Sequence, residues 1–241
     1  MNILRVDIFS DIACPWCYIG QARFAKALAD FEGRDQVRVT WHSYQLDPSL
    51  PERFDGSEID YLVQSKGMPR EQVEQMTQQV AAAAAGEGLP VDFAAVVPAN
   101  SLRAHFLLKT VARHDGDVDA AQHALFAAHF ANGEVISDEE VLVRIGTEAG
   151  LTAEQARAGL DDETIHAEVQ GDITRGRSIG IGGVPFFVFE DKYAVSGAQP
   201  PELFLQALTK TWQEMEPANP TLLTLDGDGA SGEACGVEGC D

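Results

Sequence analysis

The fold of this chain is indicated by the run Ile3-Leu4-Arg5-Val6-Asp7-Ile8-Phe9, which is followed after four residues by Cys14-Pro15-Trp16-Cys17. The first run alternates between apolar and polar residues and predicts a strand, and residues 21–28 continue with helical periodicity. The two thiols therefore lie where a strand leads into a helix. Free backbone N–H groups and the positive dipole at a helix N-terminus favour a thiolate at Cys14, and the thiolate is the nucleophile.

The remaining residues of the motif agree with this placement. Pro15 fits the first helical turn, where the missing N–H of proline loses no hydrogen bond. Cys17 then lies about one turn further along the helix, where it can attack a mixed disulfide on Cys14 and release the reduced partner. The motif predicts thiol–disulfide exchange.

A zinc site is the main alternative, because two cysteines with this spacing form half of many such sites. The chain has four cysteines, and the other two are Cys235 and Cys240. These pairs lie more than two hundred residues apart, unlike the compact ligand spacing of zinc ribbons and fingers. Redox chemistry is favoured over a structural metal site and over an incidental pair, and we expect neither a metal nor a cofactor.

Length and composition predict a protein that folds without stabilising disulfides. The chain has 241 residues, of which 45% are hydrophobic, enough for a full core. Residues 1–7 lack the basic and apolar regions of a signal peptide, and no apolar run is long enough to cross a bilayer, so we expect a cytoplasmic location. A net charge of -21 disfavours nucleic acid and membrane surfaces as partners.

The order of elements predicts an α/β thioredoxin-like fold with a large all-helical insertion domain and a flexible C-terminal tail. Capping boxes at Ser137 to Glu140 and Thr152 to Gln155 support helices within the insertion. The remaining predicted elements are a strand at 36–46, helices throughout 57–178, strands at 185–189 and 193–196 around a turn at 190–191, and a helix at 201–215. The predicted domains are 1–56 and 179–216 for the two parts of the thioredoxin-like domain, 57–178 for the insertion, and 217–241 for an acidic, glycine-rich tail.

Three separated motifs carry a resemblance to a known family. They are Asp11-Ile12-Ala13-Cys14-Pro15-Trp16-Cys17-Tyr18-Ile19-Gly20, then Asn100-Ser101-Leu102-Arg103-Ala104-His105, then Gly180-Ile181-Gly182-Gly183-Val184-Pro185-Phe186-Phe187-Val188 with Gly197-Ala198-Gln199. Over most of residues 3–215 the chain resembles the DsbA family of thioredoxin-fold oxidoreductases, and within it the cytoplasmic FrnE-like proteins. The resemblance implies that Cys14 attacks, that Cys17 resolves, and that Pro185 is a cis-proline facing them.

The segment before Pro185 is expected to contact the substrate. A proline that begins a strand leaves neighbouring backbone groups unpaired for a peptide, which makes Val184 a substrate-binding residue. Gly182 and Gly183 are expected to permit a tight approach. The alternative is an ordinary trans-proline, since cis is the minority state even for X-Pro bonds.

The dipeptide between the cysteines predicts a motif less oxidising than that of periplasmic DsbA, because Pro15-Trp16 supplies no imidazolium beside the thiolate. Trp16 offers an apolar surface for substrate, or alternatively packs against the insertion. A cytosolic thiol pool would keep the pair reduced. We therefore expect isomerase, reductase or peroxide-related work under oxidative stress, with protein or peptide disulfides as substrates and glutathione or the thioredoxin system as partner.

The tail carries a candidate second redox pair. Gly236 and Gly239 allow Cys235 and Cys240 to close a small loop, and FrnE-like proteins resemble this arrangement. About 19 residues of flexible chain have a reach of roughly 25 Å, enough to approach Cys14. Idle thiols and metal capture are the alternatives.

Two other functions compete with disulfide exchange. Glutathione-dependent isomerases of the same superfamily, which resemble 2-hydroxychromene-2-carboxylate isomerase and kappa-class glutathione transferases, use one hydroxyl or thiol near the position of Cys14. Such a site needs no resolving thiol, so Cys17 argues against it. The other is a metal-binding or interaction module without catalysis. The six histidines have no zinc-helix spacing, and His105 and Asn100 fit a packed face and a cap as well as a substrate groove.

Overall fold

The computed structural model describes residues 3–215, so the predicted tail with Cys235 and Cys240 lies outside the described residues. Its elements in chain order are β1 (Leu4–Ser10), α1 (Pro15–Asp30), a 3-10 turn (Arg34–Gln36), β2 (Val37–Ser43), α2 (Glu58–Lys66), α3 (Arg70–Gly86), α4 (Leu102–Arg113), α5 (Val118–Phe130), α6 (Glu139–Glu148), α7 (Ala153–Leu160), α8 (Glu163–Ser178), β3 (Phe186–Phe189), β4 (Tyr193–Ser196) and α9 (Pro201–Met215).

The sheet has the strand order β2-β1-β3-β4, which makes β1 a central strand. β1 pairs in parallel with β2 and antiparallel with β3, so that Ile8 pairs with Trp41 on one side and Phe187 on the other. A parallel pair needs a crossover connection, and α1 provides it. The end of β1 therefore leads directly to Cys14 and the start of α1.

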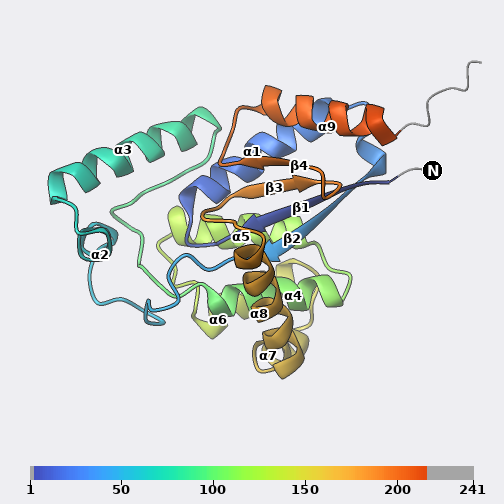
Figure 1. The fold of residues 1–241 in the computed structure, drawn as a ribbon. Helices are drawn as coiled ribbons and strands as arrows, with labels where there is room; N and C mark the ends of the chain where they lie inside the picture. Colours follow the sequence, from blue (N-terminus) through green and yellow to red (C-terminus); the bar gives the residue numbers. More distant parts are fainter. Residues whose placement is uncertain (1–2, 216–241) are drawn as a thin grey trace, which may run out of the picture.

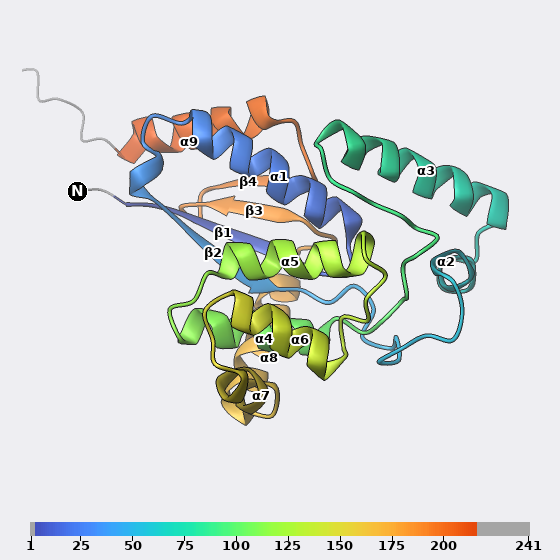
Figure 2. The ribbon, with the colours of Figure 1, turned by 180° about the vertical axis from the view of Figure 1, so that it is seen from behind.

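Helices cover both faces of the sheet. Figures 1 and 2 show α1 and α9 on one face and α4 to α8 on the other, with α2 and α3 to one side. Aromatic side chains fill the first interface: the ring of Phe204 in α9 lies 4.5 Å from that of Phe187 and 5.7 Å from that of Phe24. Burial of each such ring stabilises the fold by roughly 1.5–3 kcal/mol.

The active-site helix α1 is also anchored to the insertion. Tyr18, one residue after the second cysteine, is 1% exposed. Its ring stacks on Phe126 and Phe130 of α5, with centroids 5.1 and 6.4 Å away. Because Phe24 packs toward the sheet and Tyr18 toward α5, both sides of α1 are held and Cys14 has a fixed position.

The predicted fold class is confirmed, and one cap is different. The capping box from Thr152 to Gln155 is present. The box at Ser137 is wrong, because α6 is capped by Asp138, whose side chain accepts hydrogen bonds from the N–H groups of Glu140 and Val141. Ser137 instead donates to the carbonyl of Glu52 over 2.5 Å.

The boundaries predicted for the domains stay a prediction.

Among residues 3–215, no helix has both the length and the apolar character needed to span a bilayer.

Candidate active site

Cys14 is the N-cap residue of α1, and Pro15 occupies the first turn as the sequence predicts. The loop before it is closed by a 3.0 Å hydrogen bond from the Cys14 N–H to the Asp11 carbonyl. The side chain is 5% exposed, and its Sγ lies 3.6 Å from the carbonyl oxygen of Val184, to which the thiol donates. The first cysteine thus combines a helix N-terminus with a contact to the predicted substrate segment.

Cys17 has a different environment. It is 1% exposed, and its Sγ accepts a 3.5 Å contact from the N–H of Asp11. Burial raises the pKa of Cys17 well above its ordinary value, and the adjacent Cys14 raises it further. Cys17 therefore remains a thiol in the reduced pair, which leaves Cys14 as the nucleophile that the geometry favours.

The Val184–Pro185 peptide bond is cis, as the resemblance implies. The close approach beside it is permitted by Gly20, where a Cβ atom would lie 2.8 Å from Cγ of Pro185. The expectation for Gly182 and Gly183 is wrong, because a Cβ atom at either position would have no neighbour within 4 Å.

A cavity of about 550 Å³ opens beside Cys14, between the start of α1, the segment after β2, and helices α2 and α3. We call it the Cys14 pocket. Trp16, which is 40% exposed, lines it. Its other apolar lining includes Leu46, Leu50, Leu62, Met76, Val80 and Phe93, and its polar lining includes Asp11, Asp47, Glu58, Tyr61, Lys66, Thr77, Ser101 and His129.

Asp11 fixes the loop that carries the cysteines. Its carboxylate accepts hydrogen bonds from the N–H groups of Ala13 at 3.2 Å and Leu46 at 2.7 Å, and Nε2 of His105 lies 3.4 Å away. Burial alone would raise the pKa of Asp11, but His105, Ser101 and the Leu46 N–H outweigh burial and lower it. His105 therefore lies on a packed face behind the active site.

Two further titratable groups of the pocket are buried. Glu58 is 8% exposed, and burial raises its pKa to about 7. His129 is 2% exposed, and burial lowers its pKa to about 4 although the charge of Asp11 opposes this. Near neutral pH, His129 is uncharged and Glu58 is close to its titration midpoint.

Comparison with known proteins identifies the family. A family model for the DSBA-like thioredoxin domain matches residues 5–209. The chain belongs to this family. It is 40% identical to the crystal structure of a probable DsbA oxidoreductase, SCO1869, from Streptomyces coelicolor, with a TM-score of 0.82 and coverage of 99% of this chain and 98% of that one.

Two weaker matches also cover most of this chain. Protein YwbO of Bacillus subtilis (strain 168), which has no characterised function, is 24% identical over 86% of this chain and 96% of its own length. The cytosolic disulfide reductase DsbM from Pseudomonas aeruginosa with GSH is 20% identical, with a TM-score of 0.62 and coverage of 87% of this chain and 99% of that one, which shows a shared fold. The protein is a thiol–disulfide oxidoreductase of the DsbA family, and its FrnE-like subgroup stays a prediction.

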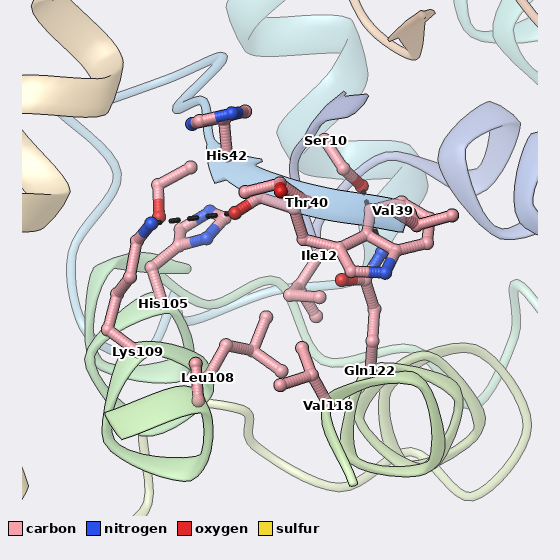
Figure 3. Close-up of a pocket in the computed structure, with 13 residues that line it drawn as sticks. Ser10, Ile12, Val39, Thr40, His42, His105, Leu108, Lys109, Val118 and Gln122 are labelled. Atoms are coloured by element: carbon pink, nitrogen blue, oxygen red, sulfur yellow. Dashed lines mark hydrogen bonds between the residues drawn. The ribbon is translucent and has the colours of Figure 1, made fainter. Parts of the chain in front are cut away.

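A second cavity of this DSBA-like protein lies between β2 and helices α4 and α5, with a volume of about 270 Å³. We call it the β2 cavity. Figure 3 shows Lys109 of α4 and Gln122 of α5 extending toward the sheet. Gln122 donates to the hydroxyl of Ser10 over 3.4 Å, and Lys109 to the carbonyl of Trp41 over 3.5 Å. Neither Cys14 nor Cys17 lines this cavity.

Metal binding receives no support from the described part of the chain. Within residues 3–215, no group of three or more histidine, cysteine, aspartate or glutamate side chains is placed to hold a metal ion. The four-cysteine alternative includes Cys235 and Cys240, which lie outside these residues.

The sequence motif contained Asp11, but nothing in its spacing indicated a buried anchor for the loop. Glu58 and His129 were missed altogether. A polar residue at the start of a helix normally faces solvent, so only the packing of α2 against α3 and the 46–50 segment reveals that Glu58 is buried.

Proposed function

We propose that this protein is a cytoplasmic dithiol–disulfide oxidoreductase with isomerase capacity, which acts on protein or peptide disulfides through a mixed disulfide on Cys14 that Cys17 resolves. The observation that carries the proposal is the asymmetry of the two thiols. Cys14 is the N-cap residue of α1 and lines the Cys14 pocket, whereas Cys17 does not line this pocket, is 1% exposed against 5% for Cys14, and has a raised pKa. This asymmetry supports attack by Cys14 and resolution by Cys17.

The exchange proceeds in two balanced steps. The Cys14 thiolate attacks one sulfur of the substrate disulfide, forms a mixed disulfide, and releases the other substrate sulfur as a thiolate. Cys17 then loses its proton and attacks Sγ of Cys14, which forms the Cys14–Cys17 disulfide and releases the second substrate sulfur. Two electrons pass to the substrate, and an isomerase cycle differs in that a substrate thiol resolves the mixed disulfide.

Val184, Pro185 and Trp16 are assigned to substrate contact. The Val184 carbonyl accepts from the Cys14 thiol in the reduced pair. A thiolate or a mixed disulfide has no proton to donate, so the same carbonyl then becomes free to accept from a substrate N–H. This supports an exchange of hydrogen-bond partners during the first step.

The electron partner and the tail belong to the same proposal. Glutathione or the thioredoxin system returns electrons to Cys14 and Cys17, and Cys235 with Cys240 serves as a second redox-active pair that exchanges with them. The shared fold with a cytosolic disulfide reductase that was solved with GSH supports glutathione and a cytosolic location.

Trapping of intermediates tests the proposal. Cys17→Ser should accumulate a mixed disulfide on Cys14 with a peptide disulfide, and Cys14→Ser should abolish exchange. Isomerisation can continue in Cys17→Ser, because a substrate thiol resolves its mixed disulfide, but net disulfide reduction that survives this substitution would instead favour a glutathione-dependent isomerase. Unchanged turnover and mixed-disulfide lifetimes in Cys235→Ser/Cys240→Ser would remove the tail from the mechanism.

A further inference from the structure

Glu58 is an unexplained buried acid in the wall of the Cys14 pocket. It is 8% exposed, and no hydrogen bond or ion pair of residues 3–215 involves its carboxyl group. A carboxylate that is mostly removed from water and has no partner in the protein is costly, so its retention calls for a functional reason.

The helix itself does not need this carboxyl group. The start of α2 is closed by a capping box in which the Ser57 side chain accepts from the N–H of Asp60 and the Asp60 side chain accepts from the N–H of Ser57. The charge of Glu58 acts on the neighbouring Tyr61, but the hydroxyl of Tyr61 is occupied because it donates to Asp47 over 2.8 Å. Glu58 therefore lines the pocket without a hydrogen-bond partner among residues 3–215, although the positive end of the α2 dipole favours an acidic group in this first turn.

The charges around the pocket favour some ligands over others. Its lining includes three carboxyl groups, on Asp11, Asp47 and Glu58, against one cation, the exposed Lys66. The Cys14 thiolate adds negative charge when it reacts. A substrate that brings a carboxylate into this site would meet like charges in a poorly solvated space.

We propose that the Cys14 pocket receives an uncharged apolar group attached beside the reacting sulfur of the substrate, and that Glu58 selects this group by repelling carboxylates. This inference rests on the proposed attack by Cys14 and names the substrate class of that site. A volume of about 550 Å³ is within the range of small-molecule pockets and exceeds the size of one aromatic side chain.

The titration of Glu58 agrees with this role. Burial raises its pKa to about 7, so the group is largely ionised at pH 8, and the ionised form repels a carboxylate. The apolar group could come from a peptide side chain next to the cysteine or from a small-molecule disulfide, because both present the same chemistry to the pocket.

The test measures how fast the reduced full chain reacts with matched disulfides at pH 8. The probes are bis(2-phenylethyl) disulfide, bis(2-hydroxyethyl) disulfide and bis(2-carboxyethyl) disulfide. Disulfides of N-acetylated and C-terminally amidated Cys-Phe and Cys-Asp dipeptides form the peptide arm. Acid quenching, alkylation and peptide mapping report the modification of Cys14 separately from the other cysteines.

We expect the phenylethyl probe to react about tenfold or more faster than the carboxyethyl probe. Glu58→Gln should accelerate the carboxyethyl probe several-fold and narrow this ratio, whereas the exposed Glu71→Gln of α3 should not. Met76→Trp, which fills the pocket, should slow the phenylethyl probe and spare the smaller hydroxyethyl probe. A preference among the dipeptides identifies a peptide source, and a preference limited to the small disulfides identifies a small molecule.

The outcomes separate the inference from the function on which it rests. If no probe oxidises Cys14, the proposed function fails and the inference with it. If all probes react at similar rates, or if Glu58→Gln and Glu71→Gln have the same effect, disulfide exchange stands and the pocket is not selective as proposed.

Discussion

Glu58 and Asp172 are carboxyl groups removed from solvent near the two cavities, and their pKa values are shifted in opposite directions. Glu58 lines the Cys14 pocket with 8% exposure, and burial raises its pKa to about 7. Asp172 of α8 binds two residues that line the β2 cavity, and its side chain is 13% exposed. Burial alone would raise its pKa, but His42, Lys109 and the Ser43 N–H outweigh burial and lower it to about 2.

The difference lies in the partners. Asp172 Oδ1 is 2.8 Å from Nδ1 of His42, and Oδ2 is 2.5 Å from Nζ of Lys109 and 3.0 Å from the N–H of Ser43. The other ring nitrogen of His42 lies 2.5 Å from Asp7, so one cluster connects β1, β2, α4 and α8. A carboxylate with every partner supplied by the protein belongs to the scaffold, whereas one with none is available to a ligand.

The largest effect is expected from removing the paired group. Asp172→Ala leaves Lys109 and His42 without their common acceptor, and breaking such a pair destabilises a fold by about 3–5 kcal/mol. Urea unfolding at pH 7 measures this. Asp161→Ala, an exposed aspartate without a side-chain partner in the described structure, should change stability by less than about 0.5 kcal/mol. Equal losses in the two variants would show that the cluster does not hold the sheet to the insertion.

Removing the unpaired carboxyl group of Glu58 should raise the stability of the fold rather than lower it. The folded pKa of Glu58, about 7, lies above its ordinary value of 4.5. Stability linked to this group is therefore complete below pH 4.5 and is lost as the pH rises through 7, by roughly 3 kcal/mol in all.

Glu58→Gln removes this loss, so the variant should be more stable than the wild type by roughly 3 kcal/mol at pH 8 and about equally stable at pH 4.5. Chemical unfolding at both pH values provides the measurement. The exposed Glu71→Gln is the matched control and should show no such pH dependence. A destabilised Glu58→Gln at pH 8 would mean that the carboxylate has a partner after all.

At Asp172, stability should depend on pH in the opposite direction to that expected for Glu58. Its folded pKa of about 2 lies below the ordinary 3.8, so its contribution is present above pH 3.8 and is lost as the pH falls through 2. This contribution is roughly 2 kcal/mol. The stability gap between the wild type and Asp172→Asn should shrink by that amount between pH 5 and pH 2 in denaturant titrations. A gap that is independent of pH would contradict the charge pairing.

Local patterns in the sequence predicted the backbone elements that carry the active-site cysteines. The alternation in β1 and the period of α1 placed Cys14 at the helix start because both signals arise from neighbouring residues. The cap of α6 shows the limit of such reasoning, since Ser137 and Asp138 are both good caps and only the tertiary bond from Ser137 to Glu52 decides between them.

The pocket could not be predicted in this way. The burial of Glu58 depends on how α2, α3 and the segment after β2 pack together, which no spacing encodes. The glycines teach the same lesson: Gly182 and Gly183 lie beside Pro185 in sequence, but Gly20 on α1 is the residue whose missing side chain makes room for the proline ring. Side chains brought together by the fold, rather than by the chain, determine the chemistry around Cys14.

The prediction with the smallest expected effect tests whether the position of the first turn of α2 keeps Glu58 without a partner. In its capping box, Ser57 Oγ accepts from the N–H of Asp60 over 3.1 Å. Ser57→Ala should lower stability by about 1 kcal/mol. A loosened first turn also admits water to Glu58, so its pKa should fall toward 4.5.

Thr152→Ala provides the control, because Thr152 and Gln155 form the same kind of box on α7 and neither lines the Cys14 pocket. Both variants should lose about 1 kcal/mol in urea unfolding. Only Ser57→Ala should reduce the gain in stability that an added Glu58→Gln produces at pH 8. Only Ser57→Ala should also narrow the ratio between the reaction rates of the phenylethyl and carboxyethyl probes. If both caps alter these two readouts equally, global stability rather than the position of α2 controls Glu58.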